Sequence, residues 1–250
     1  MNRNRTIDSV LILLLLVGLS TFPVGMFVKD AFWYYVIESL LMLAIILFIL
    51  FYLSRHPYLK PEKRDINAKN LLLFLPLLIA CISNFIYAWI FNETYHPDFS
   101  IGPAIITAMI TCLVLSVIAE ELSFRYILLS GLPQENKLVR ILISAAIFAL
   151  CHLSSFLTSF WVGDLVIVLY TFGLGIILGF IYIYGHSLIA CVVYHFIFNF
   201  MNQFLFAHLY SATSWMFYLI NGIIALLAGI YLFLIYFFIL NKKPSRTRLN

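Results

Sequence analysis

The sequence predicts an all-α, polytopic membrane protein, a bundle of about eight transmembrane helices. Of its 250 residues, 64% are hydrophobic and only 10% are charged, whereas roughly a quarter of the residues in a soluble domain carry a charge. Apolar runs of about 20 residues, the length that crosses a bilayer, recur along the chain. We therefore expect a single transmembrane domain over residues 1–250 that contacts the lipid bilayer and binds no nucleic acid.

Eight apolar segments are the expected spans. They lie at roughly 7–28, 33–53, 71–91, 102–130, 138–157, 162–184, 186–207 and 215–240. The first span follows Arg3 and Arg5 and so resembles the start of a cleavable signal peptide. Its apolar run is long and no A-x-A-like cleavage site follows it, so we interpret it as a membrane anchor.

The basic residues predict how the spans are oriented, because cytoplasmic loops carry an excess of Lys and Arg. With the N-terminus inside, the inner segments hold nearly all basic residues, and the outer loops hold only Lys29. The even number of spans then places both termini in the cytoplasm. We expect a multi-pass integral membrane protein of a bacterial plasma membrane.

Three charged residues lie inside the fourth apolar segment, Glu120, Glu121 and Arg125. Charges at membrane depth are costly and usually face a protein interior or a wet cavity, so they indicate a functional site. Glu121 and Arg125 are four residues apart and can pair on one helical face. Glu120 lies about 100° around the helix and lacks a partner there, as expected for a general base. The alternative is that all three form a structural ion cluster between helices.

Two further spans carry histidines, His152 in the fifth and His195 in the seventh. Asn199 follows His195 by four residues and shares its helical face. At 1.5 Å per residue, Glu120, His152 and His195 lie roughly 13 to 21 Å from the inner ends of their helices. The sequence therefore predicts one polar pocket in which the three helices meet.

Such a set of residues suits hydrolysis of a peptide bond inside a membrane. Glu120 can activate water with His152 orienting the same molecule, and His195 and Asn199 can donate hydrogen bonds to the developing oxyanion. The alternative is zinc held by Glu120, His152 and His195 with a position left for water. No HExxH motif occurs, which excludes a zincin-type motif.

Three motifs follow one another on successive spans, E-E-x-x-x-R at 120–125, F-x-x-x-H at 148–152 and H-x-x-x-N at 195–199. Together they resemble the motifs of the CPBP family of intramembrane proteases. That family includes the CAAX prenyl-protein endopeptidases and bacterial proteins formerly called abortive-infection or bacteriocin-processing proteins. The resemblance covers a catalytic core of about 113–203.

The resemblance implies an eight-helix bundle with a conical cavity that opens to the cytoplasmic side and the membrane. Glu120 and His152 match the family's water-activating pair, and His195 and Asn199 match its oxyanion-binding pair. The positions expected to support the site are Glu121, Arg125 and Phe148. We favour a glutamate-type reaction without a cofactor, because the asparagine is a poor zinc ligand and a good donor; zinc is the alternative.

We therefore expect an intramembrane endopeptidase that cleaves a membrane-associated protein or peptide. The resemblance suggests roles in pheromone or bacteriocin maturation or in self-immunity, and nothing in the sequence indicates a prenylated substrate. One alternative is a non-proteolytic membrane scaffold or immunity protein that retains the polar core. Another is a transporter in which Glu120 and the histidines relay protons, although no internal repeat supports it.

Overall fold

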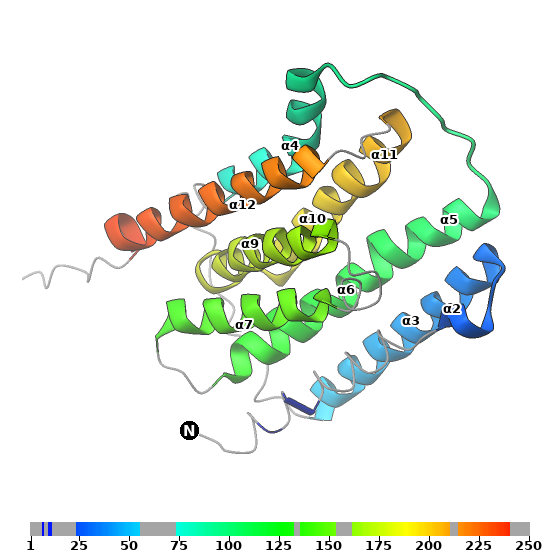
Figure 1. Ribbon diagram of the computed structural model, residues 1–250. Helices are drawn as coiled ribbons and strands as arrows, with labels where there is room; N and C mark the ends of the chain where they lie inside the picture. The colour runs from blue at the N-terminus through cyan, green and yellow to red at the C-terminus, as the bar shows by residue number, and fades with distance from the viewer. Residues whose placement is uncertain are drawn as a thin grey trace, which may run out of the picture.

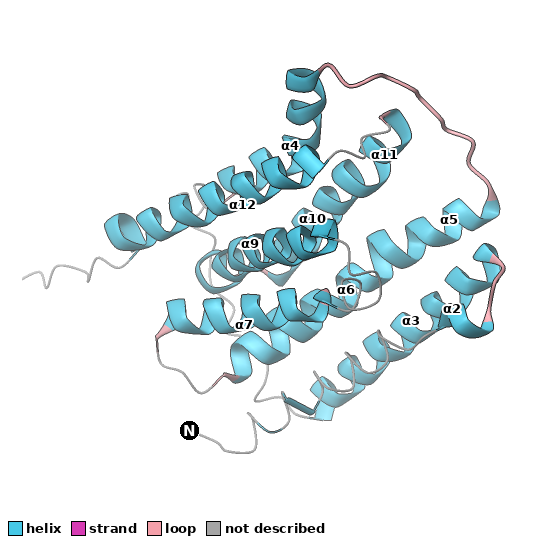
Figure 2. Ribbon diagram, in the orientation of Figure 1, coloured by secondary structure: helices cyan, strands magenta, loops and turns pink. Residues whose placement is uncertain are grey.

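A computed structural model describes residues 7, 10–11, 24–55, 74–132, 136–153, 162–210 and 215–240. Within these residues the elements are all helical (Figures 1 and 2), and the β-pairing is a single isolated bridge between Tyr95 and Tyr210. The all-α prediction is confirmed. The elements are α2 Val24–Phe27, α3 Ala31–Arg55, α4 Leu75–Phe91, α5 Pro103–Met109, η3 Ile110–Leu115, α6 Ser116–Glu121, η4 Leu122–Leu129, α7 Lys137–Cys151, α9 Val162–Gly185, α10 Leu188–Asn199, η5 Phe200–Leu205, α11 Phe206–Leu209, α12 Trp215–Ile235 and η6 Tyr236–Leu240.

Five helices in the described residues are long and apolar enough to cross a membrane, and a shorter apolar helix covers Leu78–Phe91. The five are Ala31–Arg55, Pro103–Leu129, Leu165–Gly185, Leu188–Leu209 and Leu219–Phe238. They agree with five of the eight expected spans, and the number eight stays a prediction. Most of the first expected span, 7–28, lies outside the described residues.

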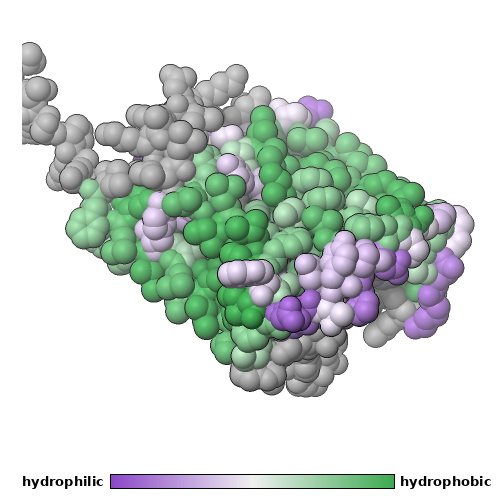
Figure 3. Space-filling model, turned by 90° about the horizontal axis from the view of Figure 1, so that it is seen from above, coloured by the Kyte–Doolittle hydropathy of each residue, from purple (hydrophilic) through white to green (hydrophobic). Residues whose placement is uncertain are grey.

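The outer surface of the helices is strongly apolar. Trp89 is 84% exposed, Ile189 is 77% exposed and Phe27 is 75% exposed. Figure 3 shows a face that is mostly hydrophobic, with hydrophilic residues gathered toward one side. A soluble monomer rarely exposes such continuous apolar surface, so this is an integral membrane protein.

Helix α10 occupies the centre of the bundle. It packs against α6, α9 and α4, while α3 packs along the helix that runs from α5 to α6 and α12 covers α4 and α9 (Figure 1). The start of α10 is fixed by Ser187, whose hydroxyl accepts a hydrogen bond from the Ala190 N–H at 3.1 Å and caps an otherwise free donor. The central position brings residues of α10 close to several other helices.

The segment from Pro103 to Leu129 is one continuous helix in which α-helical and π-helical turns alternate. The short α6 carries Glu120 and Glu121 and is followed directly by the π-helical η4. A second π-helical stretch, η5, follows Asn199 directly at the end of α10. Because π-turns are rare and occur frequently at functional sites, both helices are irregular where the expected site residues lie.

The connection between α4 and α5 is held by backbone hydrogen bonds to the end of α11. The His96 N–H donates to the Leu209 carbonyl at 2.9 Å, and the Asp98 N–H donates to the His208 carbonyl at 2.8 Å. The Ser100 backbone N–H, and then its hydroxyl and nearby His208, lower the pKa of the exposed Asp98 carboxyl. These contacts fasten the end of the central helix to the connecting segment.

Two glycines allow α9 to approach α7 closely, as the small-xxx-small spacing predicts. A Cβ built on Gly175 would lie 2.9 Å from the Ala145 Cα, and one on Gly179 would lie 2.9 Å from the Ile141 Cγ2. A methyl group at Gly175 would require a shift of the α7 backbone, and one at Gly179 would require a shift of the Ile141 side chain. The glycines therefore fix the position of the helix that carries Phe148 and ends directly before His152.

We expect Gly175→Ala to destabilise the protein by about 1–3 kcal/mol through overpacking against α7, despite the better helix propensity of alanine. Gly229→Ala is the matched control, because no atom lies within 4 Å of its built Cβ. Thermal unfolding of the purified protein in detergent measures both. Equal midpoints for the two variants would contradict the close packing.

Candidate active site

The site is built on an ion pair that is completely buried. The Arg125 Nε lies 3.2 Å from the Glu121 Oε2, and both side chains are 0% exposed. The contact is an electrostatic one without an aligned hydrogen bond, and the Arg125 Nη1 and Nη2 donate no hydrogen bond to any described residue. The Arg125 Cζ instead lies 4.7 Å from the centroid of the Phe148 ring, a cation–π contact that stabilises the desolvated cation.

The same glutamate holds His195. The His195 Nδ1 lies 2.9 Å from the Glu121 Oε1, and a carboxylate paired with arginine can only accept a hydrogen bond. The proton of this contact therefore sits on Nδ1, and Nε2 is directed elsewhere. It lies 3.8 Å from the Glu120 Oε2, so the ring connects the two carboxylates.

Glu120 differs from its neighbour in its surroundings. Its side chain is 26% exposed, whereas that of Glu121 is 0% exposed. Glu120 can therefore meet a substrate or a water molecule, while Glu121 is buried and paired with Arg125 and His195. The sequence predicts separate roles for the two carboxylates, and these roles stay predictions.

The Phe148 ring forms a common wall for the polar residues. Its centroid lies 4.9 Å from that of His152 and 6.0 Å from that of His195. The His152 Nδ1 lies 2.9 Å from the Phe148 carbonyl oxygen. Among the described residues no hydrogen bond or ion pair joins His152 to Glu120, so His152 reaches the cluster through this ring.

Asn199 lies one helical turn after His195 and is 7% exposed. Its Oδ1 accepts a hydrogen bond from the Gln203 Nε2 at 3.3 Å. The Asn199 Nδ2 is thus the part of the amide that can donate to an oxygen in the site. Gln203 was not among the site residues predicted from the sequence. Gln203 follows Asn199 by four residues, the same spacing that indicated a shared face for His195 and Asn199, so this spacing could have identified it.

The structure brings most of the expected site residues into one connected cluster. Glu121, Arg125, His195 and Phe148 contact one another, and Glu120 joins them through His195. The described partner of Glu120 is His195, whereas the sequence paired it with His152. The roles assigned to these residues stay predictions.

The zinc alternative finds no support in this geometry. Within the part of the chain that the structure describes, no group of three or more His, Cys, Asp and Glu side chains is placed to hold a metal ion. Both nitrogens of His195 face carboxylates, and His152 approaches the cluster through an aromatic ring. These residues therefore do not form a zinc centre as they stand.

Comparison with protein families identifies the segment that carries the cluster. Residues 102–201 match the family of type II CAAX prenyl endopeptidases that are Rce1-like. The match confirms the resemblance seen in the sequence, and it indicates a CAAX-type intramembrane protease. The Rce1-like segment holds all seven expected site residues, Glu120, Glu121, Arg125, Phe148, His152, His195 and Asn199. No curated protein matches the chain.

We expect Glu121→Leu to destabilise the Rce1-like segment strongly, because Arg125 would remain as an uncompensated buried charge. Breaking one side of a buried pair costs about 3–5 kcal/mol. The double variant Glu121→Leu with Arg125→Leu should recover part of that loss, since no isolated charge remains. Thermal midpoints of both variants measure the effect, and a double variant no more stable than the single one would contradict it.

Proposed function

We propose that this protein is a glutamate-type intramembrane endopeptidase that hydrolyses a peptide bond in a membrane-associated protein or peptide. The observation that carries the proposal is the contrast between the two neighbouring carboxylates. Glu121 is neutralised by Arg125 and His195, and Glu120 remains partly exposed beside His195. A carboxylate placed in this way can accept a proton from water.

In the proposed reaction, Glu120 and His152 orient a water molecule beside the scissile carbonyl. Glu120 takes one proton from this water as the oxygen attacks the carbonyl carbon. Glu120 then returns that proton to the amide nitrogen as the carbon–nitrogen bond breaks, which releases an amine and a carboxylic acid. The same carboxyl group thus serves first as general base and then as general acid.

The tetrahedral intermediate carries a negative oxygen that requires donors. The Asn199 Nδ2 can donate, because Gln203 already occupies the Oδ1 of the same amide. The His195 Nδ1–H donates a hydrogen bond to the Glu121 Oε1, so donation from Nε2 requires a proton on both ring nitrogens. The Glu121 carboxylate holds the ring in place, which supports the oxyanion role.

The biological setting follows from the resemblance and the charge pattern. We infer that both termini are cytoplasmic, that the protein lies in a bacterial plasma membrane, and that its substrates take part in peptide pheromone or bacteriocin maturation or in self-immunity. The same proposal includes eight membrane spans, an even number that places both termini on the same side. The apolar surface supports the membrane location of the substrate, because a substrate must reach the site from lipid or from its interface.

A non-proteolytic membrane scaffold or immunity protein is the second candidate. The observation that favours it is that Glu121, Arg125 and His195 are all buried and pair with one another, as a structural cluster would. A scaffold has no need of the partly exposed Glu120, however. Loss of Glu120 therefore separates the two functions.

We expect Glu120→Gln to lower kcat for a membrane-associated peptide by a factor on the order of 10²–10⁴, the usual contribution of a general base. Glu38→Gln, which removes the half-buried carboxylate of α3, is the matched control and should cleave as fast as the parent. Both variants are assayed as purified proteins in lipid nanodiscs. Their thermal midpoints should equal that of the parent, which shows that both variants are folded. Undiminished cleavage by Glu120→Gln would sink the catalytic assignment.

Chelation provides an independent test of the glutamate-type reaction. We expect cleavage to continue at the parent rate after prolonged incubation with a strong zinc chelator, because Glu120 needs no metal to accept a proton. Elemental analysis of the same active sample should find far less than one zinc per chain. Loss of activity that added zinc restores would replace the proposal with a metalloprotease.

A further inference from the structure

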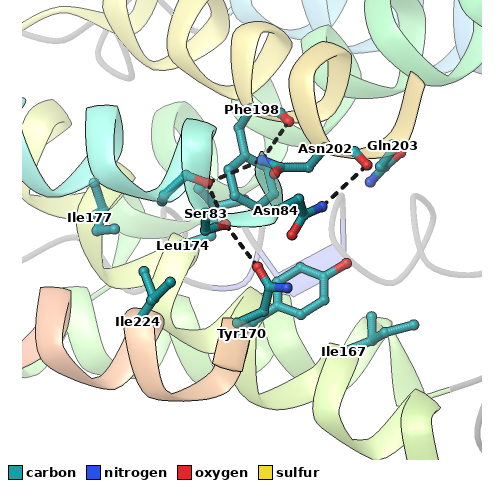
Figure 4. Close-up of a pocket in the computed structure, with 12 residues that line it drawn as sticks. Ser83, Asn84, Ile167, Tyr170, Leu174, Ile177, Phe198, Asn202, Gln203 and Ile224 are labelled. Carbon is teal, nitrogen blue, oxygen red and sulfur yellow. Dashed lines mark hydrogen bonds between the residues drawn. The ribbon is translucent and has the colours of Figure 1, made fainter. Parts of the chain in front are cut away.

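A second polar region lies on the other side of the central helix from α6. It is a cavity of about 120 Å³ between α4, α9, η5 and α12 (Figure 4). Apolar side chains and five polar residues line it, and we call it the amide cavity after the polar ones. These are Ser83, Asn84, Asn202, Gln203 and Asn221. None of these five residues carries a charge. The carboxylates and histidines of the candidate active site are not among its lining residues.

The orientation of the amide groups in this cavity is fixed by backbone carbonyls. The Asn202 Nδ2 donates to the Ala80 oxygen at 3.1 Å and to the Phe198 oxygen at 3.0 Å. The Asn84 Nδ2 donates to the Asn202 carbonyl oxygen at 3.4 Å. Exchanging oxygen and nitrogen in either amide would set two acceptors against each other, so the assignment of both groups follows from their partners.

Each of these amides therefore has an oxygen that must find a donor elsewhere. The Asn84 Oδ1 and the Asn202 Oδ1 are buried and receive no hydrogen bond from any described residue. The Asn84 residue is 3% exposed, and Figure 4 shows its side chain next to Asn202 among the residues that line the cavity. Leaving a buried acceptor unpaired is costly, so the cavity suits a small neutral ligand that brings donors.

We propose that the amide cavity binds a cluster of ordered water molecules that supplies the candidate active site. Apolar cavities stay dry, whereas a polar cavity of sufficient size holds water that makes two to four hydrogen bonds. One water needs roughly 10–15 Å³ of such space, so this cavity accommodates several. Ser83 and Asn221, joined by a hydrogen bond of 2.8 Å, add polar groups to the wall.

Gln203 connects the water cluster to the site. Its side chain lines the amide cavity, and its Nε2 donates to the Asn199 Oδ1. A water molecule beside Glu120 needs further hydrogen-bonding partners to remain there, and we infer that the water cluster provides them through Gln203 and Asn199. The supply role rests on the proposed function, whereas the binding of water does not.

Solid-state NMR of the full chain in lipid bilayers tests the binding of water. With asparagine labelled in ¹³C and ¹⁵N, magnetisation that starts on water should reach the side-chain amides of Asn84 and Asn202. Ile224→Phe fills the cavity from α12 and should lower that transfer at least about 3-fold, because the larger side chain displaces the water molecules next to the amides. Its neighbour Ile223 is 46% exposed and does not line the cavity, so Ile223→Phe should leave the transfer unchanged.

The same two variants test the supply of water through cleavage kinetics. We expect Ile224→Phe to lower kcat about 10-fold with KM unchanged. The reason is that fewer enzyme molecules then hold a water beside Glu120, while the substrate still binds. Ile223→Phe should match the parent in both constants and in thermal midpoint.

Three outcomes decide the inference. Absence of water transfer to Asn84 and Asn202 in the parent would overturn it altogether. Loss of transfer in Ile224→Phe with an unchanged kcat would overturn the supply of water. Absence of cleavage in every variant would instead remove the proposed function, and the transfer measured in the parent would still decide whether the cavity binds water.

Discussion

The candidate site depends on one constraint, the neutralisation of charge at membrane depth. Arg125 cannot lose its proton under ordinary conditions, so its burial at 0% exposure requires an anion, and Glu121 supplies it at 3.2 Å. The remaining oxygen of Glu121 then accepts from His195 at 2.9 Å, and the Phe148 ring covers the guanidinium. Glu121 and Arg125 lie on one helix, and the contacts of this pair with His195 and Phe148 bring two further helices, α10 and α7, against it.

The central helix links the features that the chemistry needs. His195 and Asn199 lie on α10, and the next turns, in η5, carry Asn202 and Gln203. One stretch of chain therefore contacts the carboxylates on one side and the amide cavity on another. The Ser187 cap at its start and the backbone pairing of 96–98 at the end of α11 hold this stretch at both ends. Substitutions in the cavity can thus influence the site through a single element.

The sequence predicts what depends on spacing within a helix or on apolar length. Such local rules predict four features of the structure. These are the Glu121–Arg125 pair, the shared face of His195 and Asn199, the close approach at Gly175 and five of the spans. The contact of His195 with Glu120, the position of the Arg125 guanidinium over Phe148 and the amide cavity join residues far apart in the chain, and a periodicity contains no information on them. The π-helical turns after Glu121 and Asn199 have no recognised sequence signal either, because they arise from how neighbouring helices pack.

The contact between α7 and α9 has a consequence for how the protein responds to its lipid environment. Because Gly175 and Gly179 lie directly against Ala145 and Ile141, a tilt of α9 also moves α7. Helix α7 carries Phe148 and ends directly before His152. Helices adjust their tilt to the thickness of the surrounding hydrocarbon. A change in bilayer thickness that tilts α9 would therefore also shift the Phe148 ring on α7, which contacts Arg125 and His195.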